Sequence, residues 1–258
     1  ATDLGVQINK GHISPDHFLS LNHVPELHQL REENGAIVVG AKVTFERLRR
    51  FSKKRAPELS EFLDLFASPQ IKHVCTLVGN VANGSPIADS PPYMMMAEAT
   101  VMVQGPAGQR SIPMQEFYLG YKTLNLNPDE LITAISIPLP TAHEQIKLYK
   151  VSARRDLDIS CVNAAISMTV GEDQRIRDIR LAYGGVGPVV KRLPETEAML
   201  IGKPVSRDSF AAAAAHIRNE ITPISDVRGS QAFRYRLAEN LLKRFCAEVL
   251  SEASVAAK

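Results

Sequence analysis

Apolar residues form two kinds of repeat along the N-terminal half, and each kind predicts a different element. The continuous apolar run at residues 36–41 predicts a buried strand, and Thr44 after it suits the cap of a helix. Apolar positions spaced by three and four from Leu59 to Phe66 predict a second helix with one buried face. The N-terminal half is therefore expected to mix strands with helices.

The same mixture continues to the C-terminus. We expect a helix start at residues 92–97, and strands at residues 100–104, 131–137, 147–151, 161–170 and 176–184. Helices are expected at residues 210–217 and 233–250, the second with a core-facing stripe of Leu237, Leu241, Leu242 and Phe245. Residues 251–258 are expected to form a frayed tail. This order of elements predicts the α+β class.

A proline-rich stretch at residues 138–142 is the best candidate for a domain boundary. A chain of 258 residues is long enough for two domains. We therefore predict one domain at residues 1–140 and a second, smaller α+β domain with an antiparallel sheet and helices at residues 141–258.

The most polar run of the chain lies between two apolar segments at residues 79–92. We interpret this run as a ligand-binding loop, in which Gly79 and Gly84 adopt positive φ and Asn80 adds donors for a pyrophosphate. Asp89 would then accept a hydrogen bond from a ribose hydroxyl. The same residue types are typical of ordinary surface turns, and this alternative stays open.

Composition and charge exclude several classes of protein. The formal net charge is +2, and the basic residues at 47–55 are best interpreted as a solvated helix face, so we expect no nucleic-acid partner. No apolar stretch approaches the roughly 18 residues that span a bilayer, so we expect no membrane segment. The first residues have no features of a secretory signal, which leads us to expect a cytoplasmic location.

The chain offers few residues for metal binding or acid–base chemistry. Three cysteines, at 75, 161 and 246, are far apart, and the seven histidines form no metal-binding pair. We therefore expect no protein-bound metal and no iron–sulfur cluster on this chain. No nucleophile motif or paired carboxylates were found, and we assign no catalytic residue.

Several motifs carry a family resemblance. Besides residues 79–92, they lie at residues 1–5, 118–122 with 128–130, 149–155, 181–185, and 223–230 with 235–237. In this order the motifs resemble the flavin domain of the xanthine dehydrogenase family of molybdenum hydroxylases, and residues 85–92 look most like the small subunit of bacterial two-subunit members. The resemblance implies a PCMH-type FAD-binding fold followed by a carbon monoxide dehydrogenase flavoprotein-like C-terminal domain.

The resemblance also implies a set of flavin contacts. The remaining part of a first phosphate loop would be Ala1, Thr2, Asp3, Leu4 and Gly5, and a second loop would contain Thr76, Gly79 and Asn80. Asp89 would lie at the adenosine side, Phe66 beside the isoalloxazine ring, and Ile132 and Lys150 along the flavin. From the residues alone, Phe66 is also a core position and Lys150 is compatible with an exposed strand position.

Two positions depart from the family pattern. Val78 stands where relatives often have a glycine, and Leu157 where relatives usually have an acid, which puts the tuning of the flavin or of NAD binding in doubt. The chain also opens inside the first phosphate loop, so it resembles a fragment that lacks an iron–sulfur domain and the first strands of the flavin domain. We therefore expect this chain to bind FAD weakly or to lack it.

The function that the resemblance implies is electron transfer. FAD would take electrons from 2Fe-2S clusters and pass a hydride to NAD, while a molybdenum cofactor oxidises the purine. The clusters and the molybdenum cofactor would belong to a missing domain or to a large partner subunit, so we expect a hetero-oligomer and no activity from this chain alone. Two alternatives stay open: the medium flavin subunit of a hydroxylase for carbon monoxide or an aromatic N-heterocycle, and a flavin-free docking scaffold.

Overall fold

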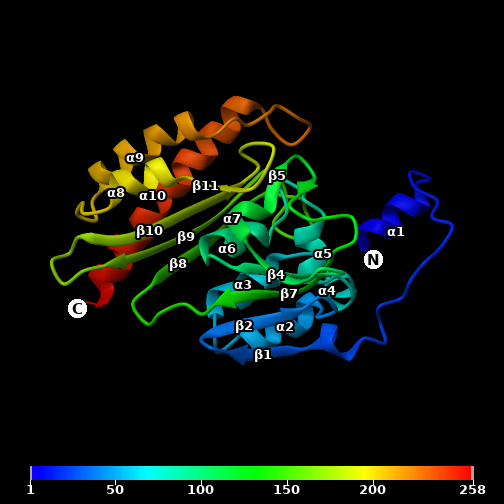
Figure 1. Ribbon diagram of the computed structural model, residues 1–258. Coiled ribbons are helices and arrows are strands. Elements are labelled where there is room, and N and C mark those ends of the chain that lie inside the picture. Colours follow the sequence, from blue (N-terminus) through cyan, green and yellow to red (C-terminus); the bar gives the residue numbers. More distant parts are fainter. Residues whose placement is uncertain (1, 257–258) are drawn as a thin grey trace. The chain divides into compact units, whose positions relative to one another are not determined.

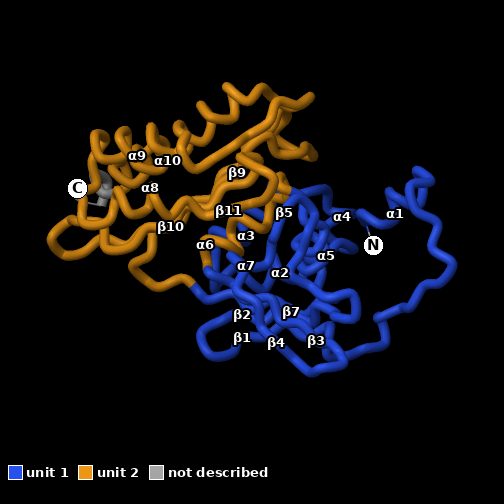
Figure 2. The backbone as a smooth tube through the Cα atoms, turned by 45° about the horizontal axis from the view of Figure 1, so that its top comes forward, with its two compact units in different colours: residues 1–85, 98–139 blue, residues 86–97, 140–258 orange. Residues whose placement is uncertain are grey.

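The computed structural model describes the backbone of residues 2–256, and the chain forms two compact units (Figure 2). Unit 1 contains Ala1–Ser85 and Glu98–Leu139, and unit 2 contains Pro86–Ala97 and Pro140–Lys258. The chain thus enters unit 2 for one short segment before it returns to unit 1. No helix in the described part of the chain is both long and apolar enough to cross a membrane.

Unit 1 is built on a five-stranded antiparallel sheet. Its strands, in spatial order, are β1 (Leu30–Glu33), β2 (Ala36–Gly40), β7 (Leu131–Pro138), β3 (Thr100–Gly105) and β4 (Gly108–Pro113). A separate two-stranded ribbon pairs β5 (Tyr118–Gly120) with β6 (Thr123–Leu124). Gly40 closes β2 where a Cβ atom would lie 2.4 Å from the Leu27 carbonyl oxygen, so only glycine fits there.

Short helices complete unit 1. They are α1 (Thr2–Asn9), a 3₁₀ turn η1 (Pro25–His28), α2 (Phe45–Ser52), α3 (Pro57–Leu65), α4 (Pro69–Val74), α5 (Leu77–Ala82) and α7 (Met114–Phe117). Thr44 caps α2 by accepting a hydrogen bond from the Arg47 amide, as the sequence predicts. Helix α2 contacts both α3 and α4, and α3 buries Leu59, Phe62 and Leu63.

Unit 2 contains a four-stranded antiparallel sheet with helices packed against it (Figure 1). The strand order is β11 (Lys191–Arg192), β10 (Ile176–Gly184), β9 (Val162–Val170) and β8 (Gln145–Val151). The helices are α6 (Pro91–Met96), α8 (Pro194–Leu200), α9 (Arg207–Glu220) and α10 (Gln231–Ala256). The long helix α10 contacts α9, β9 and β8.

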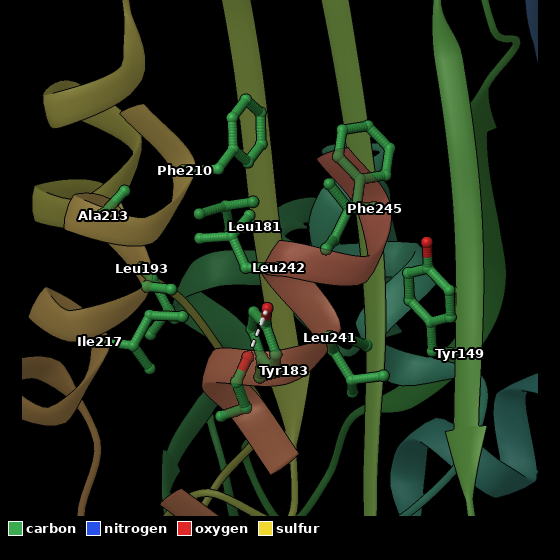
Figure 3. Close-up of a cluster of buried hydrophobic side chains, with 14 of the residues drawn as sticks. Tyr149, Leu181, Tyr183, Leu193, Phe210, Ala213, Ile217, Leu241, Leu242 and Phe245 are labelled. Atoms are coloured by element: carbon green, nitrogen blue, oxygen red, sulfur yellow. Dashed lines mark hydrogen bonds between the residues drawn. The ribbon is translucent and has the colours of Figure 1, made fainter. Parts of the chain in front are cut away.

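The core of unit 2 lies between one face of this sheet and helices α9 and α10 (Figure 3). Phe210 and Phe245 meet with ring centroids 6.2 Å apart, and the Tyr183 hydroxyl donates to the Ala238 carbonyl oxygen at 3.3 Å. Alternate residues of β9 point to opposite faces, so Asn163 leaves this core for the face of the sheet that α6 contacts. This second face carries the polar cluster described below.

The structure confirms the α+β class and the main expected elements. The expected strands correspond to β2, β3, β7, β8, β9 and β10, and the expected helices to α2, α3, α6, α9 and α10. The prediction of a frayed tail is wrong for residues 251–256, because α10 continues to Ala256. Lys147 Nζ on β8 lies 2.6 Å from the Glu252 carboxylate, a contact that ties the last turns of this helix to the sheet.

Candidate functional site

The first part of the polar run at residues 79–92 is helical, so the prediction of a continuous loop is wrong there. Residues 77–82 form α5, in which Gly79 has no positive φ, whereas Gly84 has φ of 61°. The reason is an N-terminal cap of α5 that cannot be inferred from composition. Thr76 Oγ1 accepts a hydrogen bond from the Gly79 amide at 3.0 Å. Such a cap stabilises a short helix despite its low intrinsic propensity.

The space beside Gly79 is tight for a larger side chain. A Cβ atom on residue 79 would lie 3.0 Å from Thr76 Oγ1, tighter than most contacts of real Cβ atoms, and Gly79 itself is exposed. At the other end of α5, the Tyr118 hydroxyl donates to the Val81 carbonyl oxygen at 2.9 Å. The start of a helix leaves N–H groups without intrahelical acceptors, and the Thr76 hydroxyl satisfies that of Gly79.

Phe66 and Ile132 also belong to unit 1. Phe66 follows the last residue of α3, is half-buried, and lies with its ring centroid 4.4 Å from that of Phe45. Ile132 is buried in β7. Burial raises the pKa of the Cys75 thiol beside Thr76 to about 11, so this thiol is protonated near neutral pH.

In unit 2, Asp89 and Lys150 form a buried ion pair. Lys150 Nζ lies 2.5 Å from Asp89 Oδ2, and the two side chains are 4% and 10% exposed, respectively. Ser160 Oγ and Asn163 Nδ2 donate to Asp89 Oδ1 at 2.5 and 3.1 Å. The interpretation of Lys150 as an exposed strand lysine is therefore wrong, and the carboxylate of Asp89 already has three protein donors.

This cluster attaches residues 86–97 to the sheet of unit 2. Asn163 Nδ2 also donates to the Ala88 carbonyl oxygen at 3.0 Å, and the Gly185 amide donates to the Pro86 carbonyl oxygen at 2.7 Å. The sequence analysis missed Ser160 and Asn163. A signal was present for Asn163, because it is the only amide in a strand of mostly apolar residues, where a buried polar group needs partners.

Residues Thr2–Gly5 do not form a loop in the structure. They lie in helix α1, which has no buried residue, and Gln7 Nε2 donates to Asp3 Oδ2 one turn earlier at 2.9 Å. The expectation that these residues form part of a phosphate loop is wrong for their backbone, because the segment satisfies its own hydrogen bonds as a helix. Ala1 lies outside the described residues.

Of the two departures from the family pattern, Val78 is buried in α5 and Leu157 lies in an exposed bend. Leu157 has φ of 55°, in the left-handed region that a leucine rarely adopts, and the residue is 58% exposed. The Arg154 guanidinium donates to the Leu157 carbonyl oxygen at 2.9 Å. Two backbone amides, those of Arg154 and Ile159, and the nearby Arg154 charge lower the pKa of the Asp158 carboxyl.

Within the described residues, no group of histidine, cysteine or acidic side chains is arranged to hold a metal ion.

Comparison with known families identifies the class of this chain of two compact units. Residues 1–140 match the FAD binding domain in molybdopterin dehydrogenase, and residues 147–249 match the CO dehydrogenase flavoprotein C-terminal domain. The chain belongs to the molybdopterin dehydrogenase FAD-binding family. These matches confirm the resemblance on which the sequence analysis depends, together with its fold class.

Individual relatives agree with this assignment. The chain is 28% identical to xanthine dehydrogenase of Oryza sativa over 270 residues, which cover 98% of this chain and 20% of the relative. It is 27% identical to a putative xanthine dehydrogenase FAD-binding subunit of Escherichia coli, over 99% of this chain and 87% of that subunit. The structure of carbon monoxide dehydrogenase from Hydrogenophaga pseudoflava matches with a TM-score of 0.89 and 28% identity, over 94% of this chain and 85% of that one. The chain thus spans about a fifth of the length of the rice enzyme and most of the length of a separate FAD-binding subunit.

Proposed function

We propose that this chain is the FAD-binding electron-transfer part of a xanthine dehydrogenase that reduces NAD. The observation that carries the proposal is the family match over residues 1–140. Within this range, the Thr76 side chain caps the start of α5 next to the exposed Gly79. FAD, when bound, supplies both one-electron and hydride chemistry, and the protein supplies binding and orientation. The names of the rice and Escherichia coli relatives support xanthine dehydrogenase as the particular enzyme.

The residues of each unit would have separate tasks toward FAD. The start of α5 with Thr76, Gly79 and Asn80 would hold the phosphates, and Phe66 would lie beside the ring system. Asp89 and Lys150 would fix the segment at residues 86–97 on the sheet of unit 2. We divide the tasks in this way because Thr76 and Phe66 are only half-buried, whereas the side chains of Asp89 and Lys150 are buried.

Flavin loading tests the proposal directly. The full chain is incubated with FAD, desalted, and its absorbance spectrum recorded beside that of Asn80→Ala and of a control, Asn219→Ala, which alters an exposed asparagine on α9. We expect weak flavin bands in the wild type and the control, and still weaker bands in Asn80→Ala. A folded wild type whose spectrum shows no bound flavin at any FAD concentration would contradict the FAD role and leave the docking scaffold.

The electron acceptor is tested separately by running the last step in reverse. NADH is added without oxygen to the flavin-loaded chain, with dithionite as the control that any accessible flavin is reducible. We expect NADH to bleach the flavin absorbance. Bleaching by dithionite alone would contradict NAD as the acceptor while leaving the FAD role intact.

We propose further that 2Fe-2S and molybdopterin-binding parts join this chain in a hetero-oligomer, and that the enzyme is cytoplasmic, where its three buried free cysteines stay reduced. The similarity to the carbon monoxide dehydrogenase structure favours a second candidate, the medium subunit of a molybdenum hydroxylase with another substrate. Co-purification with the partner subunits, followed by assays with xanthine and with carbon monoxide, distinguishes the two. Reduction by carbon monoxide alone would favour the second candidate.

A further inference from the structure

Lys72 places a buried ammonium between the two unit 1 segments that are assigned to the flavin. Helix α3 ends at Leu65, just before Phe66, and helix α4 leads toward Thr76. Lys72 belongs to α4, and only 7% of its surface is exposed. Lys72 therefore connects the end of α3, next to Phe66, with the segment that leads to Thr76.

The acceptors of Lys72 are main-chain carbonyls at the end of α3. Its Nζ donates to the Leu63 carbonyl oxygen at 2.9 Å and to the Asp64 carbonyl oxygen at 3.2 Å. These carbonyls are among the last four of the helix, which lack intrahelical donors, and a cation at this end also interacts favourably with the helix dipole. The Asp64 carboxylate instead accepts a hydrogen bond from Arg49 at 3.0 Å. Lys72 thus closes α3 through the main chain.

The turn that follows α3 has a backbone conformation that needs such support. Ala67 has φ of 50°, in the left-handed region that favours glycine, and Phe66 before it is extended. On the other side, the Ser68 hydroxyl caps α4 by accepting the Ile71 amide at 3.2 Å. The Lys72 bonds to α3 therefore hold together the two helix ends that flank this turn.

The same helix also fixes the approach to Thr76. The Cys75 amide donates to the Ile71 carbonyl oxygen at 2.8 Å, and the Phe45 amide donates to the Cys75 carbonyl oxygen at 3.0 Å. Phe45 in turn places its ring against Phe66. Movement of α4 would consequently disturb both Phe66 and Thr76.

We propose that Lys72 is a positioning residue for the flavin, which holds Phe66 and the Thr76 turn in one fixed arrangement. The proposal rests on the FAD role proposed above. A buried ammonium is a costly way to fill space, and an apolar side chain would pack there without desolvation, so the two hydrogen bonds to α3 are the reason for a lysine at this position.

Three variants of the full chain test the proposal. Lys72→Met keeps the aliphatic chain and removes the donors, whereas Lys72→Arg keeps donors for the two carbonyls. The matched control is Lys191→Met, because Lys191 Nζ donates at 2.6 Å to the carbonyl oxygen of Glu220, the last residue of α9 in unit 2. The two readouts are amide hydrogen exchange of residues 65–80 without FAD, and the dissociation constant of FAD.

We expect Lys72→Met to exchange faster at residues 65–80 and to weaken FAD binding about tenfold, while Lys72→Arg and Lys191→Met stay near the wild type in both measurements. Equal effects of Lys72→Met and Lys191→Met on FAD binding would overturn the proposal, because loss of stability alone would explain them. Faster exchange without weaker FAD binding would also overturn it. A wild type that binds no FAD would contradict the proposed function, and the exchange data would still show whether Lys72 orders the turn.

Discussion

The two units fix their candidate flavin residues in opposite ways. In unit 1, Thr76 and Phe66 are half-buried, and Thr76 is tied to α5 through a main-chain amide. In unit 2, Asp89 and Lys150 are buried and neutralise one another at 2.5 Å. The cap satisfies one of the N–H groups at the start of α5, whereas the closed ion pair uses its donors and acceptors entirely within the protein. The comparison shows that Thr76 stabilises the start of α5 in unit 1, whereas the Asp89–Lys150 pair attaches residues 86–97 to unit 2.

The largest expected effect comes from breaking the ion pair of unit 2. Asp89→Asn leaves a buried ammonium without its counter-charge, and Lys150→Met leaves a buried carboxylate, so each change should cost about 3–5 kcal/mol of unfolding free energy. The double variant should recover a large part of this loss, because no uncompensated charge remains. Urea unfolding of the four proteins completes a double-mutant cycle.

An exposed ion pair of the same unit provides the control for this cycle. Lys147 and Glu252 have side chains that are 32% and 60% exposed, so Lys147→Met should cost no more than about 1 kcal/mol. If Asp89→Asn costs as little as this control, the cluster does not brace unit 2. The buried ion pair would then contribute no more to the stability of unit 2 than an exposed pair does.

A smaller effect is expected at the cap of α5 in unit 1. Thr76→Ala removes the oxygen that accepts the Gly79 amide and should cost about 1 kcal/mol, whereas Thr76→Ser should retain most of the stability. Ser206→Ala removes a similar cap from α9 in unit 2, since Ser206 Oγ accepts the Ser209 amide at 3.2 Å. Both alanine variants should lose similar stability, but only Thr76→Ala should weaken FAD binding. Parallel loss of FAD binding in both variants would show that the cap acts through stability alone.

The elements that the sequence predicts well are those with long periodic patterns. The apolar stripe of α3 and the near-continuous apolar run of β9 appear at the expected positions, because each buries a whole face against its unit. Helix α5 was missed because it has only six residues and contains Gly79 and Asn80, both poor helix formers. Its stability depends on the Thr76 cap, a contact that composition does not reveal.

For the site, the residue types were predicted but not their arrangement. The family resemblance assigns Asp89 and Lys150 separately to the flavin, whereas the structure pairs them with each other. Ser160 and Asn163, which complete the cluster, lie more than 70 positions from Asp89 in the sequence. Such a contact depends on how residues 86–97 cross into unit 2, and no local pattern encodes that crossing.

Acidification should give the smallest effect and should act on unit 1. Hydrogen bonds from Arg49 and then Arg50 lower the pKa of the Glu46 carboxyl from 4.5 to about 2, and Glu46 lies on α2, which packs against the helices that flank Phe66. Because the folded pKa lies below the ordinary value, the stabilisation is complete above about pH 4.5 and is lost as the pH falls toward 2. Glu46→Gln removes this contribution at every pH, so it should cost roughly 1 kcal/mol near neutral pH, where solvent screens the exposed Arg50, and much less in acid. Urea unfolding of both proteins from about pH 6 to about pH 3 measures the convergence, and a constant difference would show that the Glu46 charge does not stabilise unit 1.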